Sequence, residues 1–177
     1  MEAPDEQLML AYRDGNAGAF ETLYLRHRAR VFRFVLRGVK SRATAEELFQ
    51  EIWMRVIEAR ERYTPQARFT TWLYTIAHHR MVDHWRRGGL SLVELDEQEP
   101  PGDSPDPARQ LEAREALVRF AQALEALPVA QREAFLLHEE AGLSIAEIAA
   151  ATGSNAEAAK SRLRYAVAKL KAAVEDD

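Results

Sequence analysis

Residues 142–171 read GLSIAEIAAATGSNAEAAKSRLRYAVAKLK, and their pattern predicts the fold of the C-terminal part of the chain. Ser144 and Glu147 have the spacing of a capping box, in which each side chain bonds the backbone N–H of the other residue. The same spacing recurs at 154–157, just after Gly153, the residue type that most readily forms a left-handed helix stop. A short helix, a glycine turn and a longer helix form the helix-turn-helix pattern, whose second helix can enter a DNA major groove.

The predicted second helix, residues 155–171, concentrates positive charge in a chain whose net charge is −4. Its one acid is Glu157. A basic stripe on one helix is typical of a surface that binds nucleic-acid phosphates. The basic residues of this helix are Lys160, Arg162, Arg164, Lys169 and Lys171.

The composition is that of a soluble globular protein, with 177 residues, 47% hydrophobic and 29% charged. No apolar run approaches the roughly 18 residues that a membrane span needs, and the acidic N-terminus is unlike a secretory signal. The absence of cysteine excludes disulfides and thiolate metal sites, and it fits a reducing cytoplasm.

The acidity of the chain is local. Residues 91–112 carry seven acids and one base, a charge of −6, so the rest of the chain carries +2. The negative net charge is therefore no argument against binding nucleic acid.

The acidic segment also contains four prolines between 100 and 107. Prolines this dense cannot continue a helix, and each restrains the residue before it. We interpret 91–108 as an acidic, proline-rich linker between modules at 1–90 and 109–177. Asp106-Pro107 has the sequence of an N-cap followed by the first residue of a helix.

Helical patterns fill the rest of the chain. Thr44 and Glu47 give a third capping-box spacing, and Thr64-Pro65 ends the helix that it opens. Since no alternating run of β-branched residues occurs, we predict no sheet. The expected fold is all-α, with a four-helix N-terminal domain and a helix-turn-helix C-terminal domain. Helices are expected at 5–14, 17–38, 44–62, 68–87, 107–126 and 129–140, ahead of the two helices of the motif.

The predicted helix at 44–62 has an apolar face and an acidic face when its residues are placed 100° apart. The acidic face is either a solvated surface or a docking face for a basic partner. In a docking face, Met54 would offer adaptable apolar contact and the carboxylates would set register. This face consists of Glu47, Gln50, Glu51, Met54, Glu58 and Glu61.

The predicted helix at 68–87 places an aromatic ring beside hydroxyls and arginines, a combination that suits unpaired nucleic acid. Bases stack on aromatic rings with roughly 1–3 kcal/mol per base, and arginine pairs with phosphate. Trp72 is either this exposed ring or a side chain buried between helices. Tyr63, Phe69 and Tyr74 nearby favour the exposure of at least one aromatic ring. The stripe consists of Thr71, Trp72, Thr75, His79, Val82 and Arg86, with Arg87 just beyond.

The three nearby histidines do not have metal-site spacing. His78, His79 and His84 do not bring two imidazoles onto one helix face, and a pair made by His79 with Asp83 lacks a third ligand. The sequence contains no glycine-rich phosphate loop, nucleophile elbow or cysteine nucleophile. We therefore expect no metal, no cofactor and no enzymatic activity.

Taken in order, these segments resemble the extracytoplasmic-function (ECF) group of bacterial sigma-70-like factors, over nearly the whole chain. Residues 45–57, AEELFQEIWMRVI, resemble the family helix that docks on the clamp helices of the RNA polymerase β′ subunit. Residues 69–77, FTTWLYTIA, and 83–87, DHWRR, resemble the segment that melts and reads the −10 promoter element. The segments that resemble the −35-binding domain are 127–128 (LP), 132–133 (RE), 142–149 (GLSIAEIA) and 160–163 (KSRL).

The resemblance implies an alternative sigma factor that binds core RNA polymerase, through the β′ clamp helices and the β flap, and directs initiation at promoter DNA in the cytoplasm. It also implies an anti-sigma partner, no membrane insertion, and a linker that threads the polymerase cleft. The implied polymerase contacts are Glu47, Gln50, Glu51 and Met54. The implied −10 contacts are Trp72, Thr75, His79, Arg86 and Arg87. The implied −35 contacts are Asn155, Lys160, Ser161, Arg162, Arg164 and Tyr165.

Two places depart from the family pattern. His78-His79 stand where Arg-Asn is usual, and since that Asn helps to hold a flipped base, the −10 preference of this chain need not be the usual one. Residues 157–159, EAA, stand where Gly-Thr-Val is usual. Glu157 could accept from a cytosine amino group or cap the helix. The core side of this helix is expected to hold Ala159, Leu163, Ala166, Val167 and Leu170.

Two rival functions predict different behaviour. A stand-alone helix-turn-helix regulator would bind duplex DNA tightly without polymerase, and a helical adaptor that binds only proteins would have no salt-dependent affinity for DNA. Aromatic and basic features in both modules favour the sigma-factor interpretation.

Overall fold

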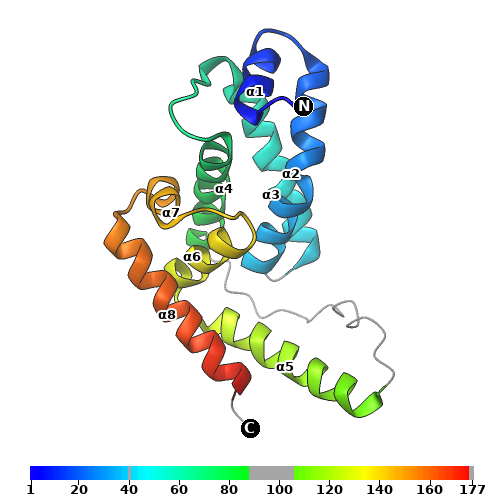
Figure 1. The fold of residues 1–177 in the computed structure, drawn as a ribbon, viewed down its shortest axis with the longest axis vertical. Coiled ribbons are helices and arrows are strands. Elements are labelled where there is room, and N and C mark those ends of the chain that lie inside the picture. Colours follow the sequence, from blue (N-terminus) through cyan, green and yellow to red (C-terminus); the bar gives the residue numbers. More distant parts are fainter. Residues whose placement is uncertain (40, 88–105, 176–177) are drawn as a thin grey trace.

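The computed structural model describes residues 1–39, 41–87 and 106–175. Its regular elements within those ranges are all helices (Figure 1), so the predicted all-α fold is confirmed. Residues 91–105, most of the predicted linker, lie outside the described residues. The elements are α1 (Asp5–Arg13), α2 (Ala17–Gly38), α3 (Arg42–Ala59), the 3-10 turn η1 (Arg60–Arg62), α4 (Phe69–Arg86), α5 (Pro107–Ala126), α6 (Val129–Glu139), α7 (Ile145–Thr152) and α8 (Ala156–Glu175).

Local capping sets the limits of these helices. α2 and α5 have the predicted limits, and Asp106 caps α5 by accepting from the backbone N–H two residues on, at 3.1 Å. The predicted capping box at Thr44 is wrong. α3 begins earlier because the Ser41 hydroxyl accepts from the Thr44 N–H at 3.4 Å, which places Thr44 inside the first turn.

The N-terminal module, residues 1–87, packs α2 against α1 and α3, and α3 against α4. The predicted apolar faces supply its core, including Phe34 at 0% exposure and Trp53 at 5%. Apolar side chains buried on the two central helices include Leu23, Val31, Phe34 and Val35 of α2 and Ala45, Leu48, Ile52, Trp53 and Val56 of α3.

The C-terminal module, residues 106–175, packs α5, α6 and α7 on α8. Arg132 holds the turn between α5 and α6. It is a buried charged residue, only 5% exposed. Its guanidinium donates to the backbone carbonyls of Leu124 at 3.1 Å, Glu125 at 2.6 Å and Leu127 at 3.5 Å. The last carbonyls of a helix have no partner within the helix, so Arg132 caps the C-terminal end of α5. Burial lowers the pKa of this guanidinium.

The two modules are in contact. α7 lies beside α4, and α6 lies beside α2 (Figure 1). The buried side chains of both modules belong to one continuous hydrophobic cluster. The sequence predicted two tethered modules, and the structure adds that they are packed together.

Candidate interfaces for nucleic acid and protein

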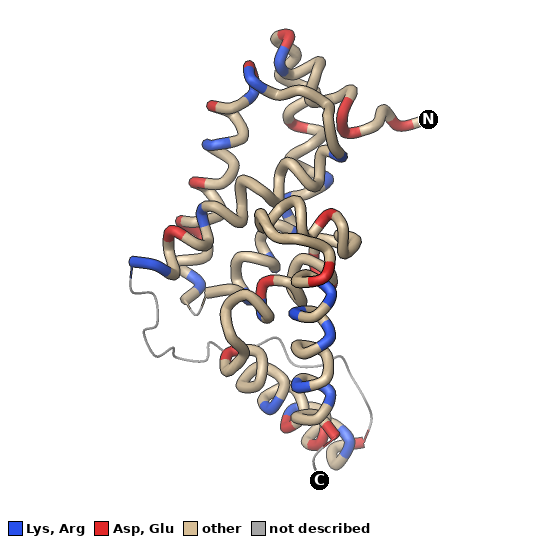
Figure 2. Tube along the Cα trace, turned by 90° about the vertical axis from the view of Figure 1, so that its left-hand side faces the viewer, with Lys and Arg blue, Asp and Glu red and all other residues tan. Residues whose placement is uncertain are grey.

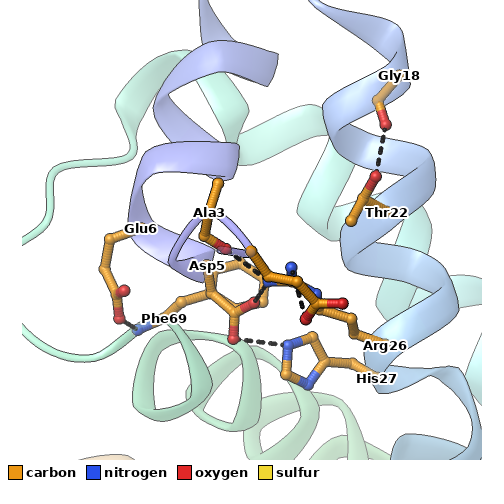
Figure 3. Close-up of polar contacts among 9 residues, drawn as sticks. Ala3, Asp5, Glu6, Gly18, Thr22, Arg26, His27 and Phe69 are labelled. Atoms are coloured by element: carbon orange, nitrogen blue, oxygen red, sulfur yellow. Dashed lines mark hydrogen bonds and ion pairs between the residues drawn. The ribbon is translucent and has the colours of Figure 1, made fainter.

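The start of α4 makes one polar contact with α1, beside a group of contacts that joins α1 to α2 (Figure 3). The Glu6 carboxylate accepts from the Phe69 backbone N–H at 2.8 Å, which satisfies one of the free donors at the start of α4. Asp5, beside it, binds Arg26 at 3.0 Å and His27 at 2.8 Å and so fastens α1 to α2. These contacts join residues far apart in the sequence, and no local pattern predicts them.

The proposed stripe for unpaired bases is only partly exposed on α4. Thr71 is buried at 5% exposure, so its predicted place on the exposed stripe is wrong. Trp72 is half-buried, between the two predicted alternatives. Tyr63, Phe69 and Tyr74, which favoured the exposure of at least one ring in this neighbourhood, are all buried to 1% or less, so of these four rings Trp72 alone is partly exposed.

Two of these buried aromatic rings, Tyr63 and Phe69, instead pack against the Trp72 ring. Its ring meets Tyr63 edge-on at 5.0 Å and lies 5.9 Å from Phe69. Burial, aided by the nearby charges of Glu6 and Asp5, raises the pKa of Tyr63 to about 12. The Trp72 ring therefore packs on buried aromatic side chains and is itself partly exposed.

The other predicted −10 contacts lie along α4 and at its end. The Thr75 hydroxyl, which is half-buried, donates to the Thr71 carbonyl at 2.7 Å. His79 is exposed one turn further on, and Arg86 and Arg87 are exposed where the helix ends. α4 thus presents a half-buried ring and hydroxyl, then an exposed imidazole, and finally two exposed guanidinium groups.

The acidic face of α3 forms an open groove of about 420 Å³. Met54 is 53% exposed in it, although a methionine is usually a buried residue. Glu51 is only partly available, because its carboxylate pairs with Arg80 of α4. The groove is lined by Glu47, Gln50, Glu51, Met54, Arg55 and Glu58.

The helix-turn-helix motif forms as predicted. The N-cap of α7 is the predicted one, and the N-cap of α8 is a different residue. Ser144 and Glu147 make the predicted capping box, at 3.2 Å and 2.8 Å, and Gly153 stops α7 with φ +66°. The second predicted box at 154–157 is wrong. Asn155 caps α8 by accepting from the backbone N–H three residues on, at 2.8 Å, so neither Ser154 nor Glu157 is needed there.

α8 packs one side inward and leaves its basic side open. Ala159 is fully buried, as predicted, but Val167 is 44% exposed, so its place on the core side is wrong. The Arg164 guanidinium lies 5.7 Å from the centre of the Tyr165 ring. Figure 2 marks basic residues along this helix towards the C-terminus. Of the predicted −35 contacts, Asn155, Lys160, Arg164 and Tyr165 are exposed and Ser161 and Arg162 are half-buried.

Two classes of site are missing from the part of the chain that the structure describes. No three of its His, Asp or Glu side chains group so as to hold a metal ion. None of its helices combines the length and the apolar character that crossing a membrane requires.

Two family models match the chain, one in each module. Sigma-70 region 2 matches residues 23–90, and Sigma-70, region 4 matches residues 117–170. The chain is 36% identical over 166 residues to RNA polymerase sigma factor CarQ of Myxococcus xanthus, with 92% of this chain and 93% of that protein covered. It is 32% identical over 170 residues to ECF RNA polymerase sigma factor SigC of Mycobacterium tuberculosis, with 96% and 91% covered.

Solved structures share the fold across both modules. CnrH, in complex with the cytosolic domain of CnrY, matches with a TM-score of 0.73 at 25% identity, and the match covers 98% of each chain. The sigma factor RpoE of Bartonella quintana, in complex with the anti-sigma factor NepR, matches with a TM-score of 0.72 at 22% identity, over 89% of this chain and 98% of that one. The second likeness shows the fold alone.

Proposed function

Because the chain belongs to the ECF sigma factors, and is an alternative sigma factor that directs promoter recognition and transcription initiation, we propose that three of its helices divide this work. α3 docks on core RNA polymerase, α4 captures unpaired bases of the −10 element, and α8 reads the −35 element. The boundaries that we propose for the working parts are 1–90, the linker 91–108, and 109–177.

The observation that carries this division is that the open basic side of α8 and the Trp72 stripe of α4 belong to different modules. In helix-turn-helix proteins the second helix lies in the major groove with its N-terminal residues at base edges. Lys160 and Arg164 then meet phosphates, with guanine edges as further acceptors. The exposed groups near the start of α8 supply base contacts, with Ser161, Arg162 and Tyr165 beside them. Asn155 has its side-chain oxygen engaged as a cap, so its free amide N–H groups are the donors that it offers.

The proposed −10 site combines stacking with charge. A base removed from the duplex loses its stacking, which costs a few kcal/mol per step. Stacking on Trp72 returns part of that free energy, and Thr75 and His79 lie on the same stripe to contact the base edge or backbone. Arg86 and Arg87 follow at the end of the helix, where phosphates of the strand can pair with them.

The proposed polymerase site is the groove on α3. Exposed Met54 supplies apolar contact, and Glu47 and Gln50 beside it are exposed and available to a basic partner. Glu51 contributes less to this site, since it already pairs with Arg80. The family relationship supports the β′ clamp helices as the partner of this groove and the β flap as a partner of the C-terminal module.

An anti-sigma factor is a further proposed partner. CnrH, which matches along the length of both modules at 25% identity, was solved in complex with the cytosolic domain of a second protein, CnrY. We propose that this chain is held by a protein of that kind in the cytoplasm until its signal arrives.

Footprinting of the assembled holoenzyme tests the division of work. Templates are cloned from start sites mapped after overexpression of the chain. We expect protection of the −35 element, and permanganate-reactive thymines in the −10 element, only when core polymerase and this chain are both present. Tight duplex protection by the chain alone would instead favour a stand-alone helix-turn-helix regulator.

A further inference from the structure

The helix that carries the proposed base-capture stripe begins without a cap of its own. α2, α3, α5 and α7 each follow a residue whose side chain accepts from a backbone N–H of the first turn. The residue before α4 is Arg68, whose guanidinium cannot accept, and the first turn of α4 contains no acid. The free N–H groups and the positive end of the helix dipole therefore have no local partner at this position.

Glu6 supplies that partner from another helix (Figure 3). Its carboxylate accepts from the Phe69 N–H at 2.8 Å, and Phe69 is the first residue of α4. Trp72 closes the same turn, because its backbone N–H donates to the Arg68 carbonyl at 3.2 Å. The turn that Glu6 caps is therefore the turn that carries the proposed stacking ring.

The rest of α1 holds the two residues on which the stacking ring packs. Asp5 binds His27 at 2.8 Å, and the His27 ring lies 5.4 Å from that of Phe69. At the other end of α1, Arg13 donates to the Tyr63 backbone carbonyl at 3.3 Å. α1 thus contacts the surroundings of the stacking ring from both of its ends.

Other contacts hold α1 in place without Glu6. Met9 and Tyr12 are buried in the core of the N-terminal module, and Asp5 pairs with Arg26 of α2 at 3.0 Å. Loss of the Glu6 carboxylate should therefore leave the module folded and change the start of α4.

We propose that Glu6 is a positioning residue for promoter opening, whose carboxylate supplies from α1 the N-cap that α4 lacks and so holds the Trp72 turn ready to receive an unpaired base. α1, which lies ahead of residues 23–90 matched by Sigma-70 region 2, thereby takes part in the −10 contact. This inference rests on the proposed function, because it takes Trp72 as the stacking ring. Glu6 does not line the groove of α3 and lies outside the C-terminal module, so polymerase and −35 binding should not depend on it.

The test removes the cap and then rebuilds it on α4 itself. Glu6→Ala deletes the carboxylate, and Arg68→Ser places a hydroxyl before α4, where the extended backbone (φ −61°, ψ 144°) suits a local N-cap. The two changes are made singly and together. Because Arg68→Ser also removes the pair with Glu147, it is the reference for the double variant. The matched control is Glu2→Ala, which removes an exposed acid that pairs with Arg26.

Promoter opening is followed in the assembled holoenzyme by 2-aminopurine in the −10 element, at chain concentrations that saturate core polymerase. Affinity for core polymerase is measured separately. Loss of an N-cap weakens a helix start by a factor of about 2 to 30 in its equilibrium constant. This factor limits the expected loss of opening, because only the fraction of chains with an ordered turn receives the base.

We expect Glu6→Ala to lower the equilibrium constant for opening about 3- to 30-fold with unchanged polymerase affinity, and Glu2→Ala to behave as the wild type. In the Arg68→Ser background, the same Glu6→Ala change should cost less than about twofold, since the serine caps the turn. A general weakening of the module would instead lower polymerase affinity as well and would cost the same in both backgrounds.

Opening by Glu6→Ala within about twofold of the wild type would overturn the proposal, and so would equal losses of opening and polymerase affinity. An equal loss of opening from Glu6→Ala in the two backgrounds, or the same loss in Glu2→Ala, would also overturn it. If Glu6→Ala lost its helical circular dichroism, Glu6→Gln would decide. It keeps the acceptor oxygen and removes the charge, so opening should fall about two- to fivefold, and wild-type opening would overturn the proposal.

Trp72→Ala, measured in parallel, separates this inference from the function on which it rests. Loss of opening in Trp72→Ala together with wild-type opening in Glu6→Ala would refute the positioning role alone. Wild-type opening in Trp72→Ala would refute the stacking role of the ring, and the positioning role with it.

Discussion

Replacing Trp72 with alanine tests whether α4 captures a promoter base through this ring. Trp72 contacts Tyr63 and Phe69, and an aromatic pair contributes about 0.5–1.5 kcal/mol beyond its buried area. Loss of both pairs should lower the free energy of unfolding of the N-terminal module by about 1–3 kcal/mol. Loss of base stacking costs roughly 1–3 kcal/mol more, but only in the melted complex. That second cost lowers the equilibrium constant for promoter opening about 5- to 150-fold.

Promoter opening is followed by the fluorescence of 2-aminopurine placed in the −10 element, and affinity for core polymerase is measured separately. Trp72→Ala should reduce opening by the factor above and leave polymerase affinity nearly unchanged. Trp72→Phe is the matched control, because it keeps an aromatic ring on the same footing and should retain most of the opening. Equal losses of opening and polymerase affinity in Trp72→Ala would refute the stacking role and indicate general damage to the module.

Four further variants or conditions probe other parts of the chain. Arg164→Ala should weaken holoenzyme binding to −35 DNA and reduce its log–log salt slope by about one unit, and an unchanged slope would remove Arg164 from the phosphate contacts. Glu47→Lys should weaken association with core polymerase in a titration, while Glu46→Lys, outside the groove, should not. Equal changes in polymerase affinity in the two variants would indicate that the acidic face of α3 is only a solvated surface. Arg132→Met should lower the free energy of unfolding in urea by about 2–4 kcal/mol, because two short hydrogen bonds from a charged donor are lost, and a change under about 0.5 kcal/mol would contradict its capping role. Burial raises the pKa of Glu147, but hydrogen bonds from Ser144 and then the charge of Arg68 outweigh burial and hold this pKa below the ordinary value of 4.5. The ionised Glu147 carboxylate therefore stabilises the folded state above pH 4.5, and this stabilisation is lost as the pH falls below that value. Glu147→Gln should abolish this part of the pH dependence of the free energy of unfolding.

Local sequence patterns predicted the helix limits well where a single residue could cap the helix end. The limits of α2 and α5 agree with the prediction, and so do the Ser144 cap and the Gly153 stop. Errors arose where two polar residues competed for one helix end. Ser41 was preferred to Thr44 and Asn155 to Ser154, since the position of the first turn depends on packing that periodicity does not contain.

The candidate sites could be predicted only as stripes on helices. Periodicity left Trp72 either exposed or buried between helices, because the Tyr63 ring that packs against it comes from another segment. The pairing of Glu51 with Arg80 joins two helices and lies beyond any single helical pattern. The contacts between modules join residues far apart in the sequence, 107 positions for Arg33 with Glu140 and 79 for Arg68 with Glu147, so neither charge reveals its partner in the sequence.

Run-off transcription shows whether two helical modules recognise a promoter at two places while bound to a larger enzyme. Purified core polymerase is supplied with this chain on templates cloned from its mapped start sites. We expect new transcripts that need the chain, and that disappear when either the −35 or the −10 element of the template is replaced. No chain-dependent transcript from any such template, or transcripts indifferent to both replacements, would contradict it.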